Sequence, residues 1–581
     1  MTQRNEQHRK WAWPLGLLLS TLMMGCILLF FSLTYATVDD TLILRQLMGF
    51  SVTEIPDFNM CVTFVLYYPL RWLSLAFPGL PWFSWMQLFL LWFASAVISK
   101  GILQCFANAR RPLWQGLLLA VFFHFVFVLR YQGWVTFTVT AAVLGAAAVM
   151  QLLSIDTEHC TNGQWIRSAL LSLLLIALSY GMREMSMFPS LAICAAAFIV
   201  QGLRRFEAGR EWLRPLAVTA VVVVVAVGGM LGIRALEVEL KPGIKEYMQW
   251  QDARSRVWDF LGVENIPGET LEELGISETH ARLLAEWYQM DGLLDLETLT
   301  LMGDAIEANR DNSLPAHLSR IGAQLSALMP SDPIAARSFL VLAVMLVSLM
   351  VFLLLPGERR SRRAAVWGLL LALVFAAVLT LYLAYKGRLL TRTFVTITLP
   401  LAALTAALLP AALPAQLKLS GRGAAALCCA AMLIAGLWYS GPYLERHLRR
   451  ELTDDELTAE ATLAAIDDYA TANEDCLLIY ENSLSGDTRM FPSTEYGISK
   501  NVHYWGGWNA HSPAYNALLE SYGFDPDNWS LEDFLSPDVR LLCGTLEPPA
   551  VLLEALGELC EVDWYLDSEW DGLYSMYFEE W

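Results

Sequence analysis

Residues 35–41 form the stretch Tyr35-Ala36-Thr37-Val38-Asp39-Asp40-Thr41, directly after a long apolar segment that runs from Trp11 to Tyr35. A segment of that length is typical of a membrane-spanning helix. Two adjacent carboxylates at its end are costly to hold close to hydrocarbon, so the acidic pair indicates a functional site. A solvated loop beyond a membrane anchor would tolerate Asp39 and Asp40 equally well. The stretch by itself leaves both interpretations open.

The composition indicates a polytopic membrane protein that also has soluble parts. Of its 581 residues, 56% are apolar and the mean hydropathy is +0.43, whereas soluble globular chains contain about 45–50% apolar residues. The net charge of −19 is unevenly distributed, because residues 451–581 hold 28 of the 58 acidic side chains and 3 of the 39 basic ones. The rest of the chain is mildly basic but has no clustered basic face, which argues against nucleic-acid binding.

Apolar runs predict about eleven membrane spans. The first run is longer than the ~7–15 residues of a signal-peptide core, so we expect it to stay uncleaved with its N-terminus in the cytoplasm. Most of the others have about 20 residues, which is enough to cross the ~30 Å hydrocarbon core. They lie near Trp82–Leu103, Leu113–Leu129, Val135–Leu153, Ser168–Tyr180, Met187–Leu203, Leu216–Leu236, Ser338–Leu355, Ala364–Leu383, Phe394–Leu413 and Ala424–Trp438.

The positive-inside rule orients these spans, because clusters of basic residues mark cytoplasmic loops. If successive spans cross the membrane in alternating directions, three such clusters lie on the cytoplasmic side: 204–214, 359–363 and 418–422. Two long polar parts of the chain then lie outside. An aromatic piece at 62–77 preserves this alternation if it lies on the membrane surface or re-enters the membrane without crossing it.

We therefore expect a mainly α-helical fold, with a membrane bundle, an extracytoplasmic helical insert and a small extracytoplasmic α/β domain. The expected domains are a membrane bundle at 1–236 with its first outer loop at 37–81, the insert at 237–335, further spans at 336–440 and an acidic domain at 441–581. In the insert, Ser277 precedes periodic apolar residues and so predicts a helix start. In the acidic domain, short apolar strands alternate with helical patterns. They are strands at Cys476–Tyr480, Val539–Cys543 and Val562–Leu566, and helices at Pro513–Tyr522 and Ala550–Leu559.

Several charged residues fall at the outer ends of spans, where the orientation rule does not require them. They are Arg130, Arg183, Glu184, Arg234, Lys386, Arg388 and Arg392. Snorkelling and pairing with lipid headgroups would account for them without a specific function. Their convergence on one side instead favours an anion site, because the planar guanidinium of arginine donates two parallel hydrogen bonds to a phosphate.

Short motifs in the membrane part resemble the C-type fold glycosyltransferases, and more narrowly a group of bacterial multipass proteins of that architecture. In both, the first span ends in an acidic pair and an aromatic, proline-marked outer loop follows. The matching stretches are Val38-Asp39-Asp40 with Met48-Gly49, Leu75-Ala76-Phe77-Pro78-Gly79-Leu80-Pro81-Trp82, Arg130-Tyr131-Gln132-Gly133-Trp134-Val135-Thr136-Phe137-Thr138-Val139-Thr140-Ala141 and Arg254-Ser255-Arg256-Val257-Trp258-Asp259. A lone Tyr68-Pro69 stands where the commoner hPP-type motif is expected, which leaves the acceptor class open.

The resemblance implies an enzyme of the bacterial plasma membrane that moves a sugar from a polyprenyl-phosphate donor to an extracytoplasmic acceptor. That acceptor could be a cell-surface polymer, a lipid or a protein. In this family an acidic residue at the start of the first outer loop acts as general base, a position that Asp39 or Asp40 matches. Some members also use a divalent metal such as Mg²⁺ or Mn²⁺, for which Asp39 or Asp40 would be the ligand.

The resemblance also implies that guanidinium groups bind the lipid phosphate and stabilise the charge that it gains on leaving. The candidate substrate-binding residues are Arg130, Arg183, Glu184, Arg254, Arg256, Arg388 and Arg392. In the tail, Trp505 and Trp508 lie beside glycines, where they could stack on a sugar or simply pack within a loop.

A rival function is that of a transporter or flippase for a lipid-linked or anionic solute. Arginines at the outer face and a central carboxylate would serve that function equally well. Transporters commonly contain internal repeats, and none is evident in this sequence. A third hypothesis, a membrane anchor for a tail that binds a surface partner, does not explain about eleven spans, since anchoring requires far fewer.

Overall fold

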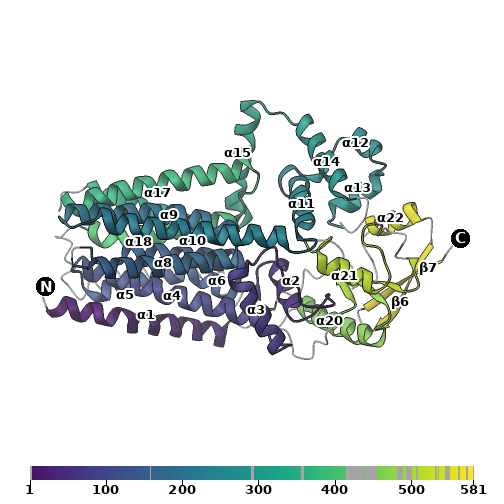
Figure 1. Cartoon of the computed structure of the whole chain (residues 1–581), viewed down its shortest axis with the longest axis horizontal. Helices are drawn as coiled ribbons and strands as arrows, with labels where there is room; N and C mark the ends of the chain where they lie inside the picture. Colours follow the sequence, from purple (N-terminus) through teal and green to yellow (C-terminus); the bar gives the residue numbers. More distant parts are fainter. Residues whose placement is uncertain are drawn as a thin grey trace.

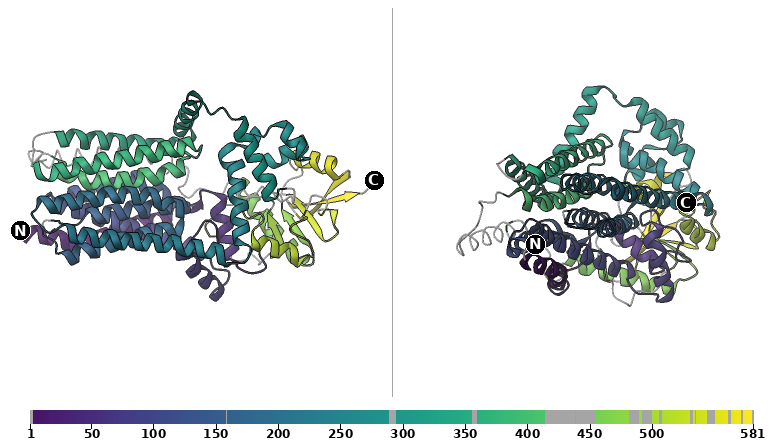
Figure 2. Two further views of the ribbon diagram at one scale, coloured as in Figure 1. Left: turned by 45° about the horizontal axis from the view of Figure 1, so that its top comes forward. Right: turned by 60° about the vertical axis from the view of Figure 1, so that its left-hand side comes forward.

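The protein extends along one axis, with a bundle of long helices at one end and the remaining elements at the other (Figure 1). The structure is a computed structural model that describes residues 3–157, 159–288, 294–354, 359–413, 438, 454–480, 489–491, 500–504, 508–529, 533, 535–543, 550–560, 563–570 and 573–579. The two chain ends lie at opposite extremities of the long axis (Figure 1). Figure 2 shows the same division between the bundle and the remaining elements from two further directions.

Nine helices within the described residues are long and apolar enough to cross a membrane, and α7 (Phe137–Leu153) is an apolar helix of 17 residues. The nine lie in α1 (Gln3–Phe30), α4 (Trp82–Asn108), the continuous α5 (Leu113–Phe123), η1 (His124–Val128) and α6 (Leu129–Gly133), α8 (Asn162–Met182), α9 (Glu184–Glu207), α10 (Leu213–Leu240), α16 (Pro333–Leu354), α17 (Arg359–Tyr385) and α18 (Thr391–Ala412). These ten elements correspond to ten of the predicted spans, so the polytopic helix bundle is confirmed. The remaining predicted span, Ala424–Trp438, lies outside the described residues except for Trp438.

Helix α7 forms the centre of the bundle, since all of its side chains are buried. It packs against α4, α8, α9 and α18. Its sequence is rich in alanine and valine, and small residues allow helices to approach closely within a membrane. At Gly145 an added Cβ atom would come within 1.9 Å of Ser190 Oγ on α9, so a larger residue there would push the two helices apart.

The chain that leaves α1 is fixed to the end of the bundle by a pair of short parallel strands, β1 (Thr34–Tyr35) and β2 (Trp134–Val135). Helix α2 (Val38–Leu47) follows at once and carries the acidic pair in its first turn. The position of α2 is therefore set on one side by the end of α1 and on the other by the start of α7.

Helix α3 (Phe64–Ala76) lies at the end of the bundle beside α2 (Figure 1). Its 13 residues extend about 20 Å at 1.5 Å per residue, which is less than the ~30 Å thickness of the hydrocarbon core. Trp72 is 65% exposed on this helix. These features fit the surface or re-entrant helix that the sequence predicts for 62–77.

The insert after α10 is helical. Its elements are α11 (Ile244–Ser255), the π-helix η2 (Arg256–Leu261), the short 3₁₀-helix η3 (Val263–Asn265), α12 (Gly268–Glu273), α13 (Glu278–Ala285), α14 (Leu296–Asn309) and α15 (Leu314–Ser331). Helix α13 begins where the sequence predicts, because Ser277 Oγ accepts a hydrogen bond from the His280 backbone N–H at 3.0 Å. Such a cap satisfies one of the amide donors that the start of a helix leaves without an intrahelical partner.

The tail folds around a five-stranded sheet of order β4-β3-β5-β7-β6, in which β4, β3 and β5 are parallel and β7 and β6 run antiparallel to their neighbours. Its strands are β3 (Leu477–Tyr480), β4 (Val502–Tyr504), β5 (Val539–Cys543), β6 (Asp563–Trp570) and β7 (Leu573–Glu579), and its helices are α20 (Asp454–Ala472), α21 (Pro513–Ser521) and α22 (Ala550–Cys560). The three predicted strands correspond to β3, β5 and β6, so the α/β domain is confirmed. The sequence analysis did not predict β4 or β7.

The tail is attached to the loop that carries the acidic pair. The backbone N–H of Met490 donates to Leu33 O at 3.3 Å, and Ser84 Oγ of α4 donates to Met490 O at 2.5 Å. Tyr35 OH is also hydrogen-bonded to Ser84 Oγ at 2.7 Å. These contacts join Met490 of the tail to the chain just before α2 and to the start of α4.

Candidate functional site

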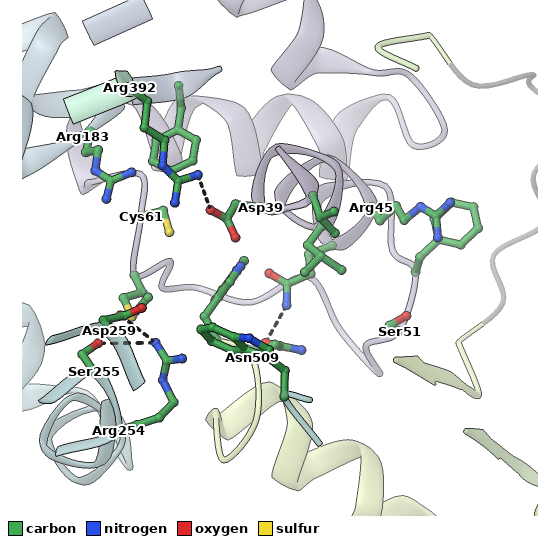
Figure 3. A pocket seen from close by; sticks show the side chains of 18 of the residues that line it. Asp39, Arg45, Ser51, Cys61, Arg183, Arg254, Ser255, Asp259, Arg392 and Asn509 are labelled. Atoms are coloured by element: carbon green, nitrogen blue, oxygen red, sulfur yellow. Dashed lines mark hydrogen bonds and ion pairs between the residues drawn. The ribbon is translucent and has the colours of Figure 1, made fainter. Parts of the chain in front are cut away.

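A cavity of about 520 Å³ lies where the spans, the insert and the tail meet. Its lining comes from α2, from Phe50, Ser51, Met60 and Cys61, from Phe137 of α7, from Arg183 between α8 and α9, from Arg388 and Arg392 around the start of α18, from the insert, and from His503, Trp508 and Asn509 of the tail. Figure 3 shows Asp39 near the middle of this lining, with Arg392 and Arg183 to one side. The cavity thus gathers polar residues that are far apart in the sequence.

Asp39 and Asp40 point in different directions from the first turn of α2. Successive residues of an α-helix are rotated by about 100°, so neighbouring side chains cannot share one direction. Asp39 lines the cavity and its side chain is 33% exposed. Asp40 is fully buried and does not line the cavity.

The Asp40 carboxylate orients α2. It accepts hydrogen bonds from Thr37 Oγ1 at 2.8 Å, from Gln87 Nε2 at 3.0 Å and from the Phe137 backbone N–H at 2.8 Å. The last bond satisfies an amide at the start of α7, so Asp40 joins α2 to both α4 and α7. Burial raises the pKa of Asp40 to about 7, while the hydrogen bonds that it accepts act in the opposite direction.

Asp39 faces a group of arginines at the ends of the spans. Arg392 Nη1, in the first turn of α18, lies 3.7 Å from Asp39 Oδ2. Both side chains are about one-third exposed, at 33% for Asp39 and 32% for Arg392. At that distance and exposure the ion pair is loose, so the carboxylate remains accessible from the cavity.

Asp259 lies between two further cavity arginines. Arg388 Nη1 is 3.0 Å from Asp259 Oδ1, and Arg254 Nη2 is 3.7 Å from Asp259 Oδ2. Arg254 also donates to Gln251 Oε1 at 2.9 Å. The insert therefore brings one carboxylate and one guanidinium to the end of the membrane bundle.

Arg183 is held between α8 and α9 without a carboxylate partner among the described residues. Its Nη1 donates to Thr138 Oγ1 at 2.6 Å, and its guanidinium lies 4.9 Å from the centre of the Phe137 ring. Burial lowers the pKa of Arg183, but an arginine keeps its proton even when the pKa is lowered. The cavity therefore contains a half-buried guanidinium that has no ion pair with a carboxylate among the described residues.

The other charged candidates lie outside the cavity lining. Arg130 forms a two-pronged ion pair with Asp332 at 2.8 and 2.6 Å, which ties the end of α6 to the start of α16. Arg256 pairs with Asp304 at 2.8 Å and Glu307 at 2.7 Å and so fixes α14 against η2. Glu184 begins α9 next to Arg183 but does not line the cavity either.

Only one of the two candidate tryptophans of the tail lies within the described residues. Trp508 lines the cavity and is 8% exposed. Its carbonyl oxygen accepts hydrogen bonds from Tyr247 OH and Gln251 Nε2, each at 2.6 Å. Trp505 lies outside the described residues.

The cavity carboxylates do not fit a divalent metal ion. Across the described ranges, no group of three or more His, Cys, Asp or Glu side chains is placed to hold one. Asp39 pairs with Arg392, and Asp259 pairs with Arg254 and Arg388, so both face cations. Asp40 points away from Asp39 and already accepts three hydrogen bonds.

Several lining residues were not found by sequence reasoning. They are Arg45, Gln46, Ser51, Cys61, Asp259, Trp287, His503 and Asn509. Asp259 could have been identified from the sequence, because it ends the Arg254–Asp259 motif. Gln46 could have been found from helical spacing, because it follows Asp39 by seven residues and shares its face of α2. Asn509 follows the candidate Trp508 directly, whereas Ser51 had no comparable signal, since only the fold brings it to the cavity.

No family model matches this sequence, and no curated protein matches it. Among solved structures, the chain is similar to the crystal structure of ArnT from Cupriavidus metallidurans bound to undecaprenyl phosphate. The similarity covers 97% of each chain at 12% sequence identity, with a TM-score of 0.37.

Proposed function

We propose that this protein is a membrane glycosyltransferase of the C-type fold, which moves a sugar from a polyprenyl-phosphate donor to an extracytoplasmic acceptor. The observation that carries the proposal is a cavity in which the Asp39 carboxylate faces arginines from the ends of several spans. A carboxylate and an anion site must lie together for a hydroxyl to be activated while a phosphate departs.

The charge of the cavity suits a lipid phosphate. Five arginines but two aspartates are among its described lining residues. Arg183 is the strongest phosphate candidate, because it brings a half-buried guanidinium that has no carboxylate ion pair among the described residues. As the bond from the sugar to the phosphate breaks, negative charge builds up on the phosphate, and guanidinium groups already in place stabilise that charge without reorganising.

Asp39 is our candidate for the general base. As an acceptor hydroxyl oxygen forms its bond to the anomeric carbon, its proton passes to Asp39, and the phosphate leaves with the electrons of the broken bond. The loose contact with Arg392 leaves the carboxylate accessible from the cavity. Asp40 cannot take this role from its buried position, and its contribution is to hold α2 in place.

The position of the cavity favours transfer over transport. Transporters bind their substrates near the middle of the bilayer, between broken helices. Here the cavity lies at one end of the bundle, while the middle is filled by the buried side chains of α7. A cavity at the membrane surface is the position expected for an enzyme that takes a lipid-linked substrate from one side.

We place the basic end of the bundle in the cytoplasm and the cavity, insert and tail outside. Arg9 pairs with Asp156, and Arg210 donates to Cys160 O at 3.4 Å. The start of α1, the turn before α8 and the basic turn after α9 therefore share one end. The cavity lies at the other end, and the positive-inside rule places the basic end in the cytoplasm.

Cysteine labelling tests this orientation. In a cysteine-free background, Glu272→Cys in the insert and Glu520→Cys in the tail are expected to react with a membrane-impermeant thiol reagent in intact bacteria. Arg210→Cys is expected to react only after lysis. Labelling of Arg210→Cys in intact cells, with protection of the other two, would show the opposite orientation.

Transfer is tested with the purified full-length protein in lipid nanodiscs. The donors are polyprenyl phosphates that carry a single hexose or pentose, and the acceptor is a crude bacterial envelope extract. We expect release of free polyprenyl phosphate together with movement of the sugar into the extract, both followed by mass spectrometry. If the lipid phosphate binds while every donor stays intact, the transferase hypothesis is wrong and transport becomes the better account.

A further inference from the structure

One helix of the insert carries a row of exposed apolar side chains. On α15 these are Leu314, Leu318, Leu325 and Met329, which are 70%, 60%, 40% and 47% exposed, respectively. They follow one another at intervals of four, seven and four residues, so on a helix with 3.6 residues per turn they share one face. We call these four residues the α15 stripe.

The α15 stripe differs from the single apolar residues that every protein surface exposes. Four large apolar side chains in one row form a contiguous patch, and such patches mark surfaces that contact a membrane or another protein. About 100° further around the helix, Ser319 and Ser326 are exposed polar residues. The exposed side chains of α15 are therefore amphipathic in their arrangement, which indicates an apolar partner for the stripe.

The neighbouring apolar residues of α15 pack on the membrane bundle. Leu328 is buried and Ile321 is partly buried, both against the core that the spans form, and α15 contacts α16 and α17. Ile321 and Leu328 follow Leu314 by seven and fourteen residues, so they border the stripe on the surface of the helix. The α15 stripe thus continues the apolar surface by which α15 packs on the spans.

Helix α15 lies at the level where spans begin. Asp332 alone separates the end of α15 at Ser331 from the start of α16 at Pro333. Ser331 Oγ also lies 3.3 Å from Thr391 Oγ1 in the first turn of α18. In Figure 1, α15 runs across the direction of the spans, beyond the end of α17. The axis of α15 therefore follows the surface of the membrane instead of leading away from it.

Tyrosines at the end of α17 mark the same level. Tyr382 and Tyr385 lie in its last turn and are exposed, and tyrosines at the ends of spans are enriched at the boundary between hydrocarbon and headgroups. The His317 ring of α15 lies 5.2 Å from the Tyr385 ring, so α15 is level with that boundary. Val374 and Val378 continue an exposed apolar face along α17 from this level into the hydrocarbon.

We propose that α15 is an interfacial helix, whose stripe is buried in the lipid leaflet that surrounds the cavity end of the bundle. The partner is the boundary between headgroups and acyl chains, into which amphipathic helices insert their apolar face by about 5–10 Å. A second protein would need a matching apolar surface at this level, whereas lipid already surrounds the spans that α15 adjoins. The inference requires only that the spans lie in a membrane, so it is independent of the transferase proposal.

The lipid contact of α15 also bears on the cavity. Residues 310–313 join α14 to α15, and Arg256 of η2 pairs with Asp304 and Glu307 of α14. Helix α11 and η2 bring Arg254 and Asp259 into the cavity lining. A stripe held in the leaflet therefore helps to fix the part of the cavity lining that the insert supplies.

Single spin labels test which medium surrounds the stripe. The full-length, cysteine-free protein is reconstituted in nanodiscs of phosphatidylethanolamine and phosphatidylglycerol. Leu318→Cys and Leu325→Cys place the label on the stripe, and Ser319→Cys and Ser326→Cys are matched positions with the same spacing. Power-saturation EPR compares the access of oxygen, which dissolves in lipid, with the access of a water-soluble nickel chelate.

Two further labels calibrate the measurement. Val374→Cys on α17 gives the ratio of oxygen access to nickel access for hydrocarbon, and Glu520→Cys in the tail gives the ratio for water. The ratio at Leu318→Cys and Leu325→Cys is expected to lie well above the aqueous value, toward that of Val374→Cys. At Ser319→Cys and Ser326→Cys the ratio should be lower and close to that of Glu520→Cys.

Either of two results would overturn the proposal. A ratio at the stripe positions equal to the aqueous value would show that the stripe is solvated. Exclusion of both reagents from these positions would show that a protein, such as a second copy of the chain, covers the stripe in place of lipid. A labelled variant is compared only if it keeps the native melting temperature, and Leu314→Cys or Met329→Cys replaces one that does not.

Hydrogen exchange provides a second measurement that needs no label. The double substitution of Leu318→Asp with Leu325→Asp should make the backbone amides of α15 exchange at least about tenfold faster in nanodiscs, because two leucine side chains lose their burial in lipid. Ser319→Asp with Ser326→Asp adds the same charge at the same spacing away from the stripe, and exchange should stay at the native rate. Equal exchange rates in the two double variants would contradict the lipid contact.

Discussion

Replacing Asp39 with asparagine is expected to lower the rate of sugar transfer by about 10²–10⁴-fold, the usual contribution of a general base. Asparagine has nearly the size of aspartate and keeps an acceptor oxygen, but it cannot take up a proton. Binding of undecaprenyl phosphate should remain, because that function is assigned to the arginines. The measurement is release of polyprenyl phosphate from a sugar-loaded donor at saturating acceptor extract.

Asp40→Asn is the matched control, because the two residues are adjacent and the substitution is the same. Its Oδ1 can still accept from Gln87 and from the Phe137 N–H, so α2 should keep its position and transfer should remain within a few-fold of the native rate. Full activity in Asp39→Asn would rule out the proposed base. Loss of activity in Asp40→Asn alone, at an unchanged melting temperature, would reverse the two roles.

The same control predicts a pH effect on stability. The pKa of Asp40 is raised by folding from its ordinary value of 3.8 to about 7, so between these values the folded protein binds a proton that the unfolded chain has lost. Stability therefore falls as the pH rises through this window, by up to about 1.4 kcal/mol per pH unit. Asp40→Asn has no such group, so its melting temperature relative to the native protein should rise between pH 5 and pH 8.

Replacing Arg183 with alanine is expected to weaken binding of undecaprenyl phosphate roughly 10- to 100-fold, the loss of a charge-assisted hydrogen bond in a buried site. The half-buried guanidinium forms no ion pair with a carboxylate among the described residues, so its N–H groups are available to the phosphate. Arg183→Lys keeps the charge but loses the planar fork, and it should recover part of the affinity. Binding is measured by titration of the lipid into nanodiscs that contain the protein.

Arg320→Ala serves as the control for Arg183. Arg320 lies on α15, where it donates to Asp311 O at 2.9 Å, and it does not line the cavity. The Arg320→Ala substitution removes one positive charge, as Arg183→Ala does, but at a position outside the cavity. The affinity for undecaprenyl phosphate should therefore be unchanged. Equal affinity in the native protein, Arg183→Ala and Arg183→Lys would show that the lipid phosphate binds elsewhere.

Most of the fold could be predicted from the sequence, because long apolar runs and short strands have strong local signatures. The acidic pair was likewise evident, since carboxylates at the end of a span are unusual. The sequence could not separate Asp39 from Asp40 by environment. The difference depends on Gln87 and Phe137, which reach Asp40 from other helices.

The ion-pair partners of the arginines could not be predicted from the local sequence. Arg130 and Arg183 both lie near the ends of spans, and both lie near aromatic rings. Arg130 is neutralised by Asp332, which lies 202 positions further along the chain, whereas Arg183, within the described residues, donates to the Thr138 hydroxyl and lies over the Phe137 ring. Only the packing of distant segments decides which charge remains for a substrate.

The attachment of the tail to the first outer loop has a consequence for biogenesis. The cavity is completed by residues from α2 near the start of the chain and by Trp508 and Asn509 near its end. While the spans enter the membrane one after another, the arginines and Asp39 are therefore present without their closing wall. A chain that is still being synthesised, or one that is truncated before residue 489, lacks Trp508 and Asn509, so the lining of the cavity is completed only late in synthesis.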